Sequence, residues 1–280
     1  MIISNNAKFN IKNSENILEH TSNLRKIDIL NLNFDSFKEN NIKLNNIDGW
    51  FRDQDKCIFD FLLSLQNTAN ITGNLLELGV WRGCSLFKIL SHCNINETLY
   101  GIDRGLQSDI LNKEKYNFNN HNQLQLINAK SEDILKYQIK NIRFVHIDAC
   151  HRGSAVYNDI INANIYTNNN AILVLDDFAV DYLGIMQAYY KAYFNKETKF
   201  IPFLKTDRKL YLCTNDYYSY YYNNVLENIV NFINHYDLKN MVRFFYISYD
   251  NMLNDILNLA DDDGQIIFEP DGNRLIYSFK

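Results

Sequence analysis

The sequence lacks an excess of positive charge, paired cysteines and long apolar runs. Its net charge is -5 and its isoelectric point about 5.7, which argues against a general phosphate-backbone binder because such a protein needs a basic face. The apolar runs are far too short to span a membrane. The 5 cysteines form no C-x-x-C pair, so free thiols in a reducing cytoplasm are the simplest interpretation. The first residues show no basic segment leading into an apolar one, so no secretory signal is expected.

The chain is long and apolar enough to form a substantial core. It has 280 residues, of which 46% are hydrophobic, which suits one large domain with an appendage or two small domains. We expect an Asn-rich lead-in with one or two short helices over residues 1–45, a central domain over 46–215 and a C-terminal extension over 216–280.

Apolar strand-like runs alternate with helical patterns through the central domain. The expected strands are Leu75–Leu78, Thr98–Ile102, Leu124–Ile127, Ile142–Ile147 and Ala171–Leu175, followed by a hairpin of Phe200–Leu204 and Lys209–Cys213. The expected helices are one within Asn46–Asn70, then Ser85–Ser91, Asp109–Lys115, a helix beginning at a capping Ser131, Ala155–Tyr166 and Gly184–Phe194.

Such alternation predicts an α/β fold with a doubly wound, mainly parallel, seven-stranded sheet. The closing hairpin should place one antiparallel strand at the sheet edge. For the extension we expect an α+β arrangement, with a helix around Val225–Tyr236, a strand at Phe244–Ser248 and two short strands around the Pro270-Asp271-Gly272 turn.

Acidic residues stand at the carboxyl ends of several expected strands. Asp103 closes the second strand, Asp148 the fourth, and Asp176 and Asp177 the fifth, while Glu77 lies near the end of the first. In an open α/β sheet that edge is where ligands bind. Random surface charge would not concentrate there, so this pattern predicts a ligand site.

The first strand runs into a glycine turn and then a helix. The turn is Gly79-x-x-x-Gly83, followed by Ser85, and it differs from the G-x-G-x-x-G that favours a dinucleotide. A carboxylate at Asp103 can accept both hydroxyls of a ribose. Together these features suggest a nucleoside with a cationic or zwitterionic end, such as S-adenosylmethionine.

Four motifs resemble those of a known family. They are Glu77-Leu-Gly-Val-Trp-Arg-Gly-Cys-Ser85, Tyr100-Gly-Ile-Asp103, His146-Ile-Asp-Ala-Cys-His151 and Leu173-Val-Leu-Asp-Asp-Phe178. In this order they resemble the class I S-adenosylmethionine-dependent methyltransferases, which have a Rossmann-like fold, and among them the bacterial sugar and small-molecule O-methyltransferases related to macrocin O-methyltransferase and cephalosporin-hydroxylase proteins. The resemblance covers roughly residues 50–215. It differs after Asp148, where family members commonly show Asp-Gly-Asp-His-x-Tyr and this chain has Asp148-Ala-Cys-His-Arg-Gly153.

The resemblance implies roles for individual residues. His151 would be the general base, and Asp148, Asp176 and Asp177 would hold Mg²⁺ or another divalent cation. The glycine turn would hold the methionine part of the cofactor, Asp103 its ribose, and the segment after the third strand its adenine. The implied cofactor-binding residues are Glu77, Gly79, Val80, Trp81, Gly83, Ser85, Asp103, Arg104, Ala129, Lys130, Ser131 and Asp148.

Elementary chemistry supports these roles. Methyl transfer from a sulfonium is an in-line displacement, and sugar hydroxyls are poor nucleophiles at neutral pH. A hard cation held by oxygen ligands lowers the pKa of a hydroxyl and positions it, and a nearby imidazole can take the proton. Asp148 and His151 lie in the loop that leaves the fourth strand, next to the expected fifth strand, so these side chains can converge.

Simpler interpretations stand beside these. The glycine turn could be an ordinary strand-to-helix turn, Asp176 and Asp177 a helix cap with a solvated neighbour, and His151 a surface histidine. His146 lies within an apolar strand, which favours a hydrogen-bonded core histidine. The tyrosines of Tyr217–Tyr222 could stack on a sugar, pack internally or form a subunit contact.

The sequence therefore predicts a cytoplasmic, metal-assisted O-methyltransferase that uses S-adenosylmethionine and acts on a sugar or another hydroxylated small molecule. No nucleic acid or membrane partner is expected, and a homo-oligomer stays open. Two alternatives remain: a binding or assembly protein that keeps the fold without turnover, and an NAD-dependent oxidoreductase, which the missing G-x-G-x-x-G disfavours.

Overall fold

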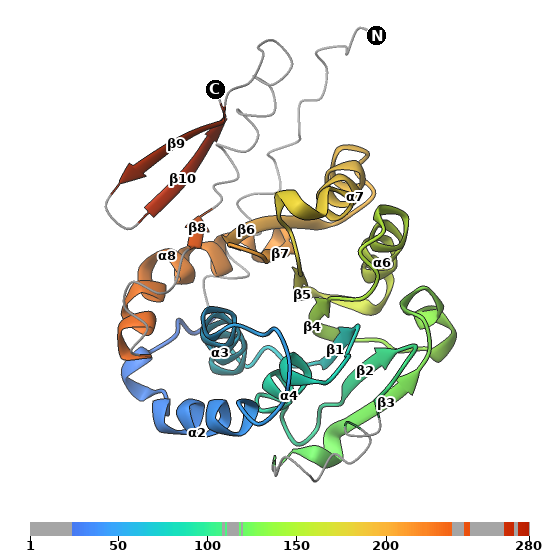
Figure 1. The fold of residues 1–280 in the computed structure, drawn as a ribbon. Helices are drawn as coiled ribbons and strands as arrows, with labels where there is room; N and C mark the ends of the chain where they lie inside the picture. The colour runs from blue at the N-terminus through green and yellow to red at the C-terminus, as the bar shows by residue number, and fades with distance from the viewer. Residues whose placement is uncertain are drawn as a thin grey trace, which may run out of the picture.

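A computed structural model describes residues 24–107, 110, 118, 120–236, 244–246, 266–271 and 274–279. Its centre is a sheet with the strand order β3-β2-β1-β4-β5-β7-β6-β8, and a second, two-stranded sheet pairs β10 with β9 (Figure 1). The strands are β1 (Asn74–Leu78), β2 (Leu99–Asp103), β3 (Leu124–Asn128), β4 (Ile142–Ile147), β5 (Thr167–Leu175), β6 (Phe200–Thr206), β7 (Leu210–Thr214), β8 (Phe244–Tyr246), β9 (Ile266–Asp271) and β10 (Arg274–Phe279).

The predicted mainly parallel seven-stranded α/β sheet is confirmed, with two differences at one side. Strands β1 to β5 pair in parallel. The hairpin β6–β7 is antiparallel as expected, but β7 lies inside the sheet because it pairs with β5 as well as with β6. Strand β8 then runs antiparallel to β6 and forms the edge, so the sheet gains an eighth strand.

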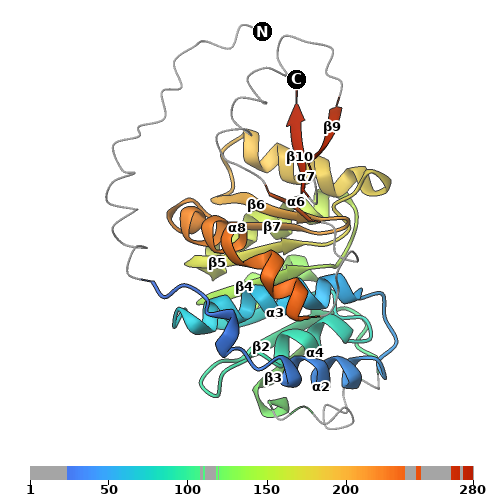
Figure 2. The same ribbon diagram turned by 90° about the vertical axis from the view of Figure 1, so that its left-hand side faces the viewer.

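Helices cover both faces of the sheet. Figure 2 shows α2, α3, α4 and α8 on the face turned to the viewer, with α6 and α7 beyond the sheet. Each face has its own core cluster, since strand residues point alternately to the two sides. The helices are α2 (Phe34–Leu44), α3 (Asp53–Thr68), α4 (Cys84–Leu90), α6 (Gly153–Tyr166), α7 (Leu183–Phe194) and α8 (Tyr218–His235), with 3-10 turns η2 (Ile29–Asn31), η4 (His121–Gln123), η5 (Ser131–Tyr137), η6 (Val180–Tyr182) and η7 (Asn215–Tyr217).

Strand β5 is central because its apolar run is covered on both sides. Residues 171–175 are fully or almost fully buried, as a parallel strand between two helix layers requires. In the pairing of β4 with β5, Ile147 lies opposite Leu175, so both strands end at the same edge of the sheet. This register fixes where the residues that follow each strand must lie.

Segments from both ends of the chain pack on helix α3. The Tyr236 hydroxyl donates to Asp60 at 2.6 Å, and the Gln66 amide donates to the Tyr221 hydroxyl at 3.0 Å. Tyr217, Tyr220 and Tyr221 are buried, which favours internal packing for these three tyrosines. Buried residues of 27–44 and 217–233, together with Phe244, therefore belong to the same core cluster as residues of the central segment, and residues 1–23 lie outside the described residues.

Two local predictions differ from the structure. Ser131 does not cap an α-helix: it is the first residue of the 3-10 helix η5, Lys130 stands in the cap position, and the Ser131 hydroxyl donates to Asp159 at 3.0 Å. Helix α8 begins earlier than expected, at Tyr218. The helix expected at Asp109–Lys115 lies almost entirely outside the described residues.

Candidate functional site

The acidic residues that follow β4 and β5 come together because those strands are neighbours. The Asp148 amide donates to the Leu78 carbonyl at 2.7 Å, and the Asp176 amide donates to the Ile147 carbonyl at 3.0 Å. These bonds continue the sheet ladder by one residue beyond each strand. The predicted convergence at the carboxyl edge of the sheet is thus what the structure shows for β1, β4 and β5.

The glycine turn needs its first glycine for a steric reason. Gly79 has φ +88°, and a Cβ atom there would lie 1.9 Å from the carbonyl oxygen of Asp148. Any side chain would therefore collide with the backbone that leaves β4. Gly83, with φ +86°, precedes helix α4 in a left-handed conformation that favours glycine. The turn thus lies directly against the loop that carries Asp148 and His151.

Asp103 ties the glycine turn to the end of β2. Its Oδ2 accepts backbone N–H bonds from Val80 and Trp81, each at 2.9 Å, and its Oδ1 accepts one from Gly105 at 2.8 Å. Trp81 has φ +45°, an uncommon backbone conformation for a bulky residue. These hydrogen bonds stabilise that conformation. The carboxylate has lone pairs left for ribose hydroxyls, which suits its predicted role.

The predicted adenine segment follows β3 next to Asp103. The Ala129 amide donates to the Asp103 carbonyl at 3.0 Å, which fixes the chain beside the turn. Lys130 is exposed and pairs with Glu132 at 3.1 Å, and Arg104 is exposed as well. The predicted cofactor residues thus lie along one edge, from the end of β4, where Asp148 follows, to the end of β3.

A buried chain of ionisable groups crosses the ends of four strands. Glu77 Oε1 accepts from the Ser85 hydroxyl at 2.5 Å and lies 2.7 Å from His146 Nδ1. His146 Nε2 lies 3.1 Å from Lys209 Nζ, and the Lys209 ammonium donates to Asp176 Oδ2. We call Glu77, His146, Asp176 and Lys209 the strand-edge network. His146 is a buried histidine as predicted, but it contacts the site.

Charge compensation holds the network together. Burial and the neighbouring charge of Lys209 would lower the pKa of His146, but the interactions with Asp176 and Glu77 outweigh both and raise the pKa to about 9. Burial would raise the pKa of Asp176, but Lys209 and His146 hold it well below its usual range. Asp176 is therefore a carboxylate that already has cationic partners within the protein.

Asp148, His151 and Asp177 form a second, more open group. His151 Nε2 lies 3.6 Å from Asp148 Oδ1 and 3.5 Å from Asp177 Oδ2, beyond ordinary hydrogen-bond length. The His151 ring packs edge-on against Tyr182 at 4.8 Å between centroids. Burial, followed by the charge of Asp176, raises the pKa of Asp148 to about 6, and the interaction with Asp148 raises the pKa of His151.

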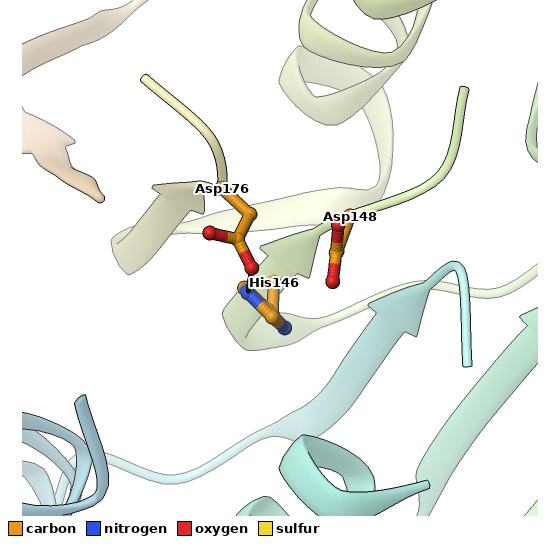
Figure 3. Close-up of side chains that lie close together, drawn as sticks. All are labelled: His146, Asp148 and Asp176. Carbon is orange, nitrogen blue, oxygen red and sulfur yellow. Dashed lines mark ion pairs between the residues drawn. The ribbon is translucent and has the colours of Figure 1, made fainter. Parts of the chain in front are cut away.

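The oxygen atoms of this edge suit a hard divalent cation. Among the described residues, ligand atoms of Asp148, His151 and Asp177 lie within 4.8 Å of one another, and so do those of His146, Asp148 and Asp176. Figure 3 shows the group of His146, Asp148 and Asp176. Asp176 lies at the tip of β5 and points toward His146, and Asp148 lies beyond the tip of β4. Carboxylates are the ligands that Mg²⁺ prefers. The predicted metal ligands are thus divided between two groups that share Asp148.

A short segment before α3 bridges the cofactor turn and the acidic edge. Asp48 pairs with Arg82, and the Trp50 ring stacks on Trp81 with centroids 4.7 Å apart. At the other end, the Phe51 ring lies 5.4 Å from Lys209 Nζ. Trp50 nevertheless remains 89% exposed, so one face of its ring is open to a ligand. Sequence reasoning gave this segment no role.

Sequence reasoning also missed Lys209 and the link from Glu77 to His146. Lys209 comes just before the apolar run of β7, and a lysine at such a buried position is unusual unless it is paired. A lysine next to this apolar run was therefore the feature of the sequence that could have indicated a buried ion pair. Its partner Asp176 is 33 positions away, so only the pairing of β7 with β5 shows which acid it meets.

The chain can be compared with protein families, with curated proteins and with solved structures. Residues 76–178 match the family described as "Methyltransferase domain". A search of curated proteins returned no relative. Within the described residues, no helix is both long and apolar enough to cross a membrane.

Several solved structures are similar in part, all at low sequence identity. A candidate O-methyltransferase from Klebsiella pneumoniae has 11% identity and a TM-score of 0.49, and the alignment covers 72% of this chain and 95% of that one. MycE from the mycinamycin pathway, in complex with Mg, SAH and mycinamycin VI, has 13% identity, a TM-score of 0.47 and coverage of 64% and 54%. CalS11, a TDP-rhamnose 3'-O-methyltransferase of calicheamicin biosynthesis, has 12% identity, a TM-score of 0.46 and coverage of 64% and 93%.

Proposed function

We propose that this chain, whose residues 76–178 match a methyltransferase domain, is a class I S-adenosylmethionine-dependent O-methyltransferase for a sugar or another hydroxylated small molecule, assisted by a divalent cation. One observation carries the proposal. The turn suited to the cofactor and the loop with Asp148 and His151 touch at Gly79, whose Cβ position is filled by the Asp148 carbonyl. A methyl donor at the turn and an acceptor at the acids would therefore be neighbours.

The cofactor-binding residues of this proposal are those of the turn and of the ends of β2 and β3. Gly79 and Gly83 leave the backbone accessible, Asp103 offers its carboxylate to the ribose, and 129–131 border the adenine. Glu77 Oε2 is buried and has no hydrogen-bond partner among the described residues, so a cationic ligand would improve its environment. S-adenosylmethionine carries both an ammonium and a sulfonium.

For the reaction, His151 is the proposed base. A divalent cation held by carboxylates of this edge, for which the sequence predicts Asp148, Asp176 and Asp177, would lower the pKa of the acceptor hydroxyl and fix its position. The hydroxyl oxygen forms a bond to the methyl carbon as the carbon–sulfur bond breaks, and the hydroxyl proton passes to His151 Nε2. Asp148 and Asp177, each near that nitrogen, stabilise the imidazolium that forms.

The choice of a small acceptor in the cytoplasm has its own support. The net charge of -5 argues against a general phosphate-backbone binder. All five cysteines are free, as in a reducing compartment. We propose that the central segment 46–215 performs the chemistry and that the lead-in and the extension 216–280 contribute to the acceptor cover or to a subunit contact.

Cofactor binding is the first test. Isothermal calorimetry should detect S-adenosylhomocysteine binding and no NAD⁺ binding, since the turn lacks the G-x-G-x-x-G pattern. Absence of S-adenosylhomocysteine binding would contradict the cofactor. With a panel of hydroxylated sugars, transfer of labelled methyl should stop in EDTA and return with Mg²⁺. Transfer that persists in chelator would remove the metal from the proposal.

The base is tested by substitution and pH. His151→Ala should lower turnover by about 10²–10⁴-fold while S-adenosylhomocysteine affinity stays unchanged. His235→Ala, an exposed histidine of α8, is the matched control. Because a base must be deprotonated to accept the hydroxyl proton, turnover should rise with pH, and His151→Ala should lose that dependence. Unchanged turnover in His151→Ala would reject this role, whereas cofactor binding without methyl transfer to any acceptor would favour a binding protein.

A further inference from the structure

Asp176 and Asp177 are adjacent in sequence but differ in what they already bind. Asp176 Oδ1 accepts the Asp177 amide at 2.7 Å, and its Oδ2 accepts from the Lys209 ammonium and lies 3.4 Å from His146 Nε2. Both oxygens of Asp176 are thus engaged by the protein. Within the described part of the chain, the Asp177 carboxylate has only longer contacts, at 3.5 Å to His151 and 3.6 Å to Arg208.

The Lys209 side chain is buried beside two aromatic rings. It is 2% exposed, and its ammonium lies 5.4 Å from the Phe51 ring centroid and 5.9 Å from that of Phe59. Aromatic faces attract a cation, and burial between them leaves the ammonium no route to solvent. The ammonium therefore stays beside Asp176, and it would repel a divalent cation that approached the same oxygen.

Asp148 and Asp177 lie on the accessible side of this ion pair. The side chains of Asp148 and Asp177 are 34% and 24% exposed, against 15% for Asp176. The carboxylate oxygens of Asp148 and Asp177 lie 3.6 and 3.5 Å from His151 Nε2, too far for hydrogen bonds, so lone pairs remain on them for a cation. Figure 3 shows the Asp176 side chain turned to His146.

We propose that the Lys209 ammonium is permanently paired with the Asp176 carboxylate. The divalent cation of the proposed reaction is then held by Asp148 and Asp177, and Asp176 is not one of its ligands. This inference rests on the proposed function. Lys209 is then a positioning residue: it orients Asp176 and His146 behind the site and limits the number of carboxylates offered to the metal to two. The cation should consequently exchange readily.

Direct Mn²⁺ binding to the full-length protein, followed by electron paramagnetic resonance, tests the ligand set without an acceptor. Asp177→Asn should weaken Mn²⁺ at least tenfold, whereas Asp176→Asn should change it less than threefold. Asp207→Asn, in the neighbouring loop, is the control and should match the wild type. Equal losses in Asp176→Asn and Asp177→Asn would overturn the proposal.

Variants of Lys209 test the cause. Lys209→Met releases a carboxylate and should tighten Mn²⁺ at least fivefold, while Lys209→Arg keeps the charge and should restore the wild-type affinity. Because Lys209→Met could impair folding, the pair Lys209→Met with Asp176→Asn removes both charges together. It should bind Mn²⁺ like the wild type, and a tenfold loss would make Asp176 a ligand and overturn the proposal.

Different results would overturn the proposed function and the inference about Lys209 and Asp176. Wild-type protein that binds S-adenosylhomocysteine but no Mn²⁺ would overturn the metal part of the proposed function together with this inference. Wild-type protein that binds Mn²⁺ but loses it in Asp176→Asn would overturn the inference alone.

Discussion

Two buried networks of charged groups can be compared in this molecule. One, which we call the Asp60 network, lies between helices α3, α4 and α8: Asp60 meets Lys88 at 2.5 Å, His92 at 2.7 Å and Tyr236 at 2.6 Å. The other is the strand-edge network of Glu77, His146, Asp176 and Lys209. Both contain carboxylates that are fully or largely buried and paired with a lysine and a histidine.

They differ in how completely their hydrogen bonds are made. Both oxygens of Asp60 have partners within the protein. At the strand edge, Glu77 Oε2 has none in the part of the chain that the structure describes, and Asp148 and Asp177 approach His151 only at 3.5–3.6 Å. Perturbed pKa values therefore do not by themselves mark a functional site. The incomplete pairing lies at the carboxyl edge of the parallel strands, which is where ligands bind in open α/β sheets.

The largest expected effect breaks the Asp60 network. Asp60→Ala leaves the buried Lys88 ammonium without its counter-ion, so the free energy of unfolding should fall by about 3–5 kcal/mol. Urea unfolding followed by circular dichroism measures this, with the exposed Asp35→Ala as control, which should stay within about 0.5 kcal/mol of the wild type. The folded fraction should bind S-adenosylhomocysteine normally. Weaker binding with little loss of stability would make the Asp60 network functional.

The succession of strands along the chain and the placing of acids at the ends of β2, β4 and β5 could be predicted from the sequence, because apolar runs locate those strands. Asp103, Asp148 and Asp176 each follow a run that periodicity alone locates. The partners of those acids could not be predicted. His146 meets Glu77 across 69 positions, and which atoms meet depends on the register of β1 against β4.

Local chemistry explains two further differences. Gly79 was assigned to ligand contact, and the structure adds a second requirement, the close Asp148 carbonyl, which only tertiary packing creates. Ser131 looked like a cap, but its hydroxyl donates to the buried Asp159 of α6 instead. Short polar side chains bond to whichever acceptor the fold brings near, so their partners are the least predictable.

A substitution of intermediate effect sharpens the comparison at Glu77. Glu77→Gln keeps an oxygen that accepts from Ser85 and from His146 but removes the charge that a cationic cofactor would meet. We expect S-adenosylhomocysteine affinity to fall by about tenfold, equivalent to about 1.4 kcal/mol, with a loss of stability well below that of Asp60→Ala. Calorimetry and urea unfolding give the two values. A loss of stability as large as that of Asp60→Ala, with unchanged affinity, would make the two networks equivalent.

Asp159 shows the behaviour of a buried carboxyl group whose contacts include no ion pair among those described, and it gives the smallest expected effect. Burial raises its pKa from 3.8 to about 7, while the Ser131 hydrogen bond opposes the shift. Between these values the folded protein holds a proton that the unfolded chain has lost, so stability should fall as pH rises from about 4 to 7 and stay low above that. Asp159→Asn cannot ionise, and its thermal midpoint should lose less between pH 5 and 8 than that of the wild type. If the thermal midpoints of the two proteins change equally with pH, Asp159 is charged throughout this range. Burial alone would then not raise the pKa of a carboxyl group enough to explain why the two networks contain cations.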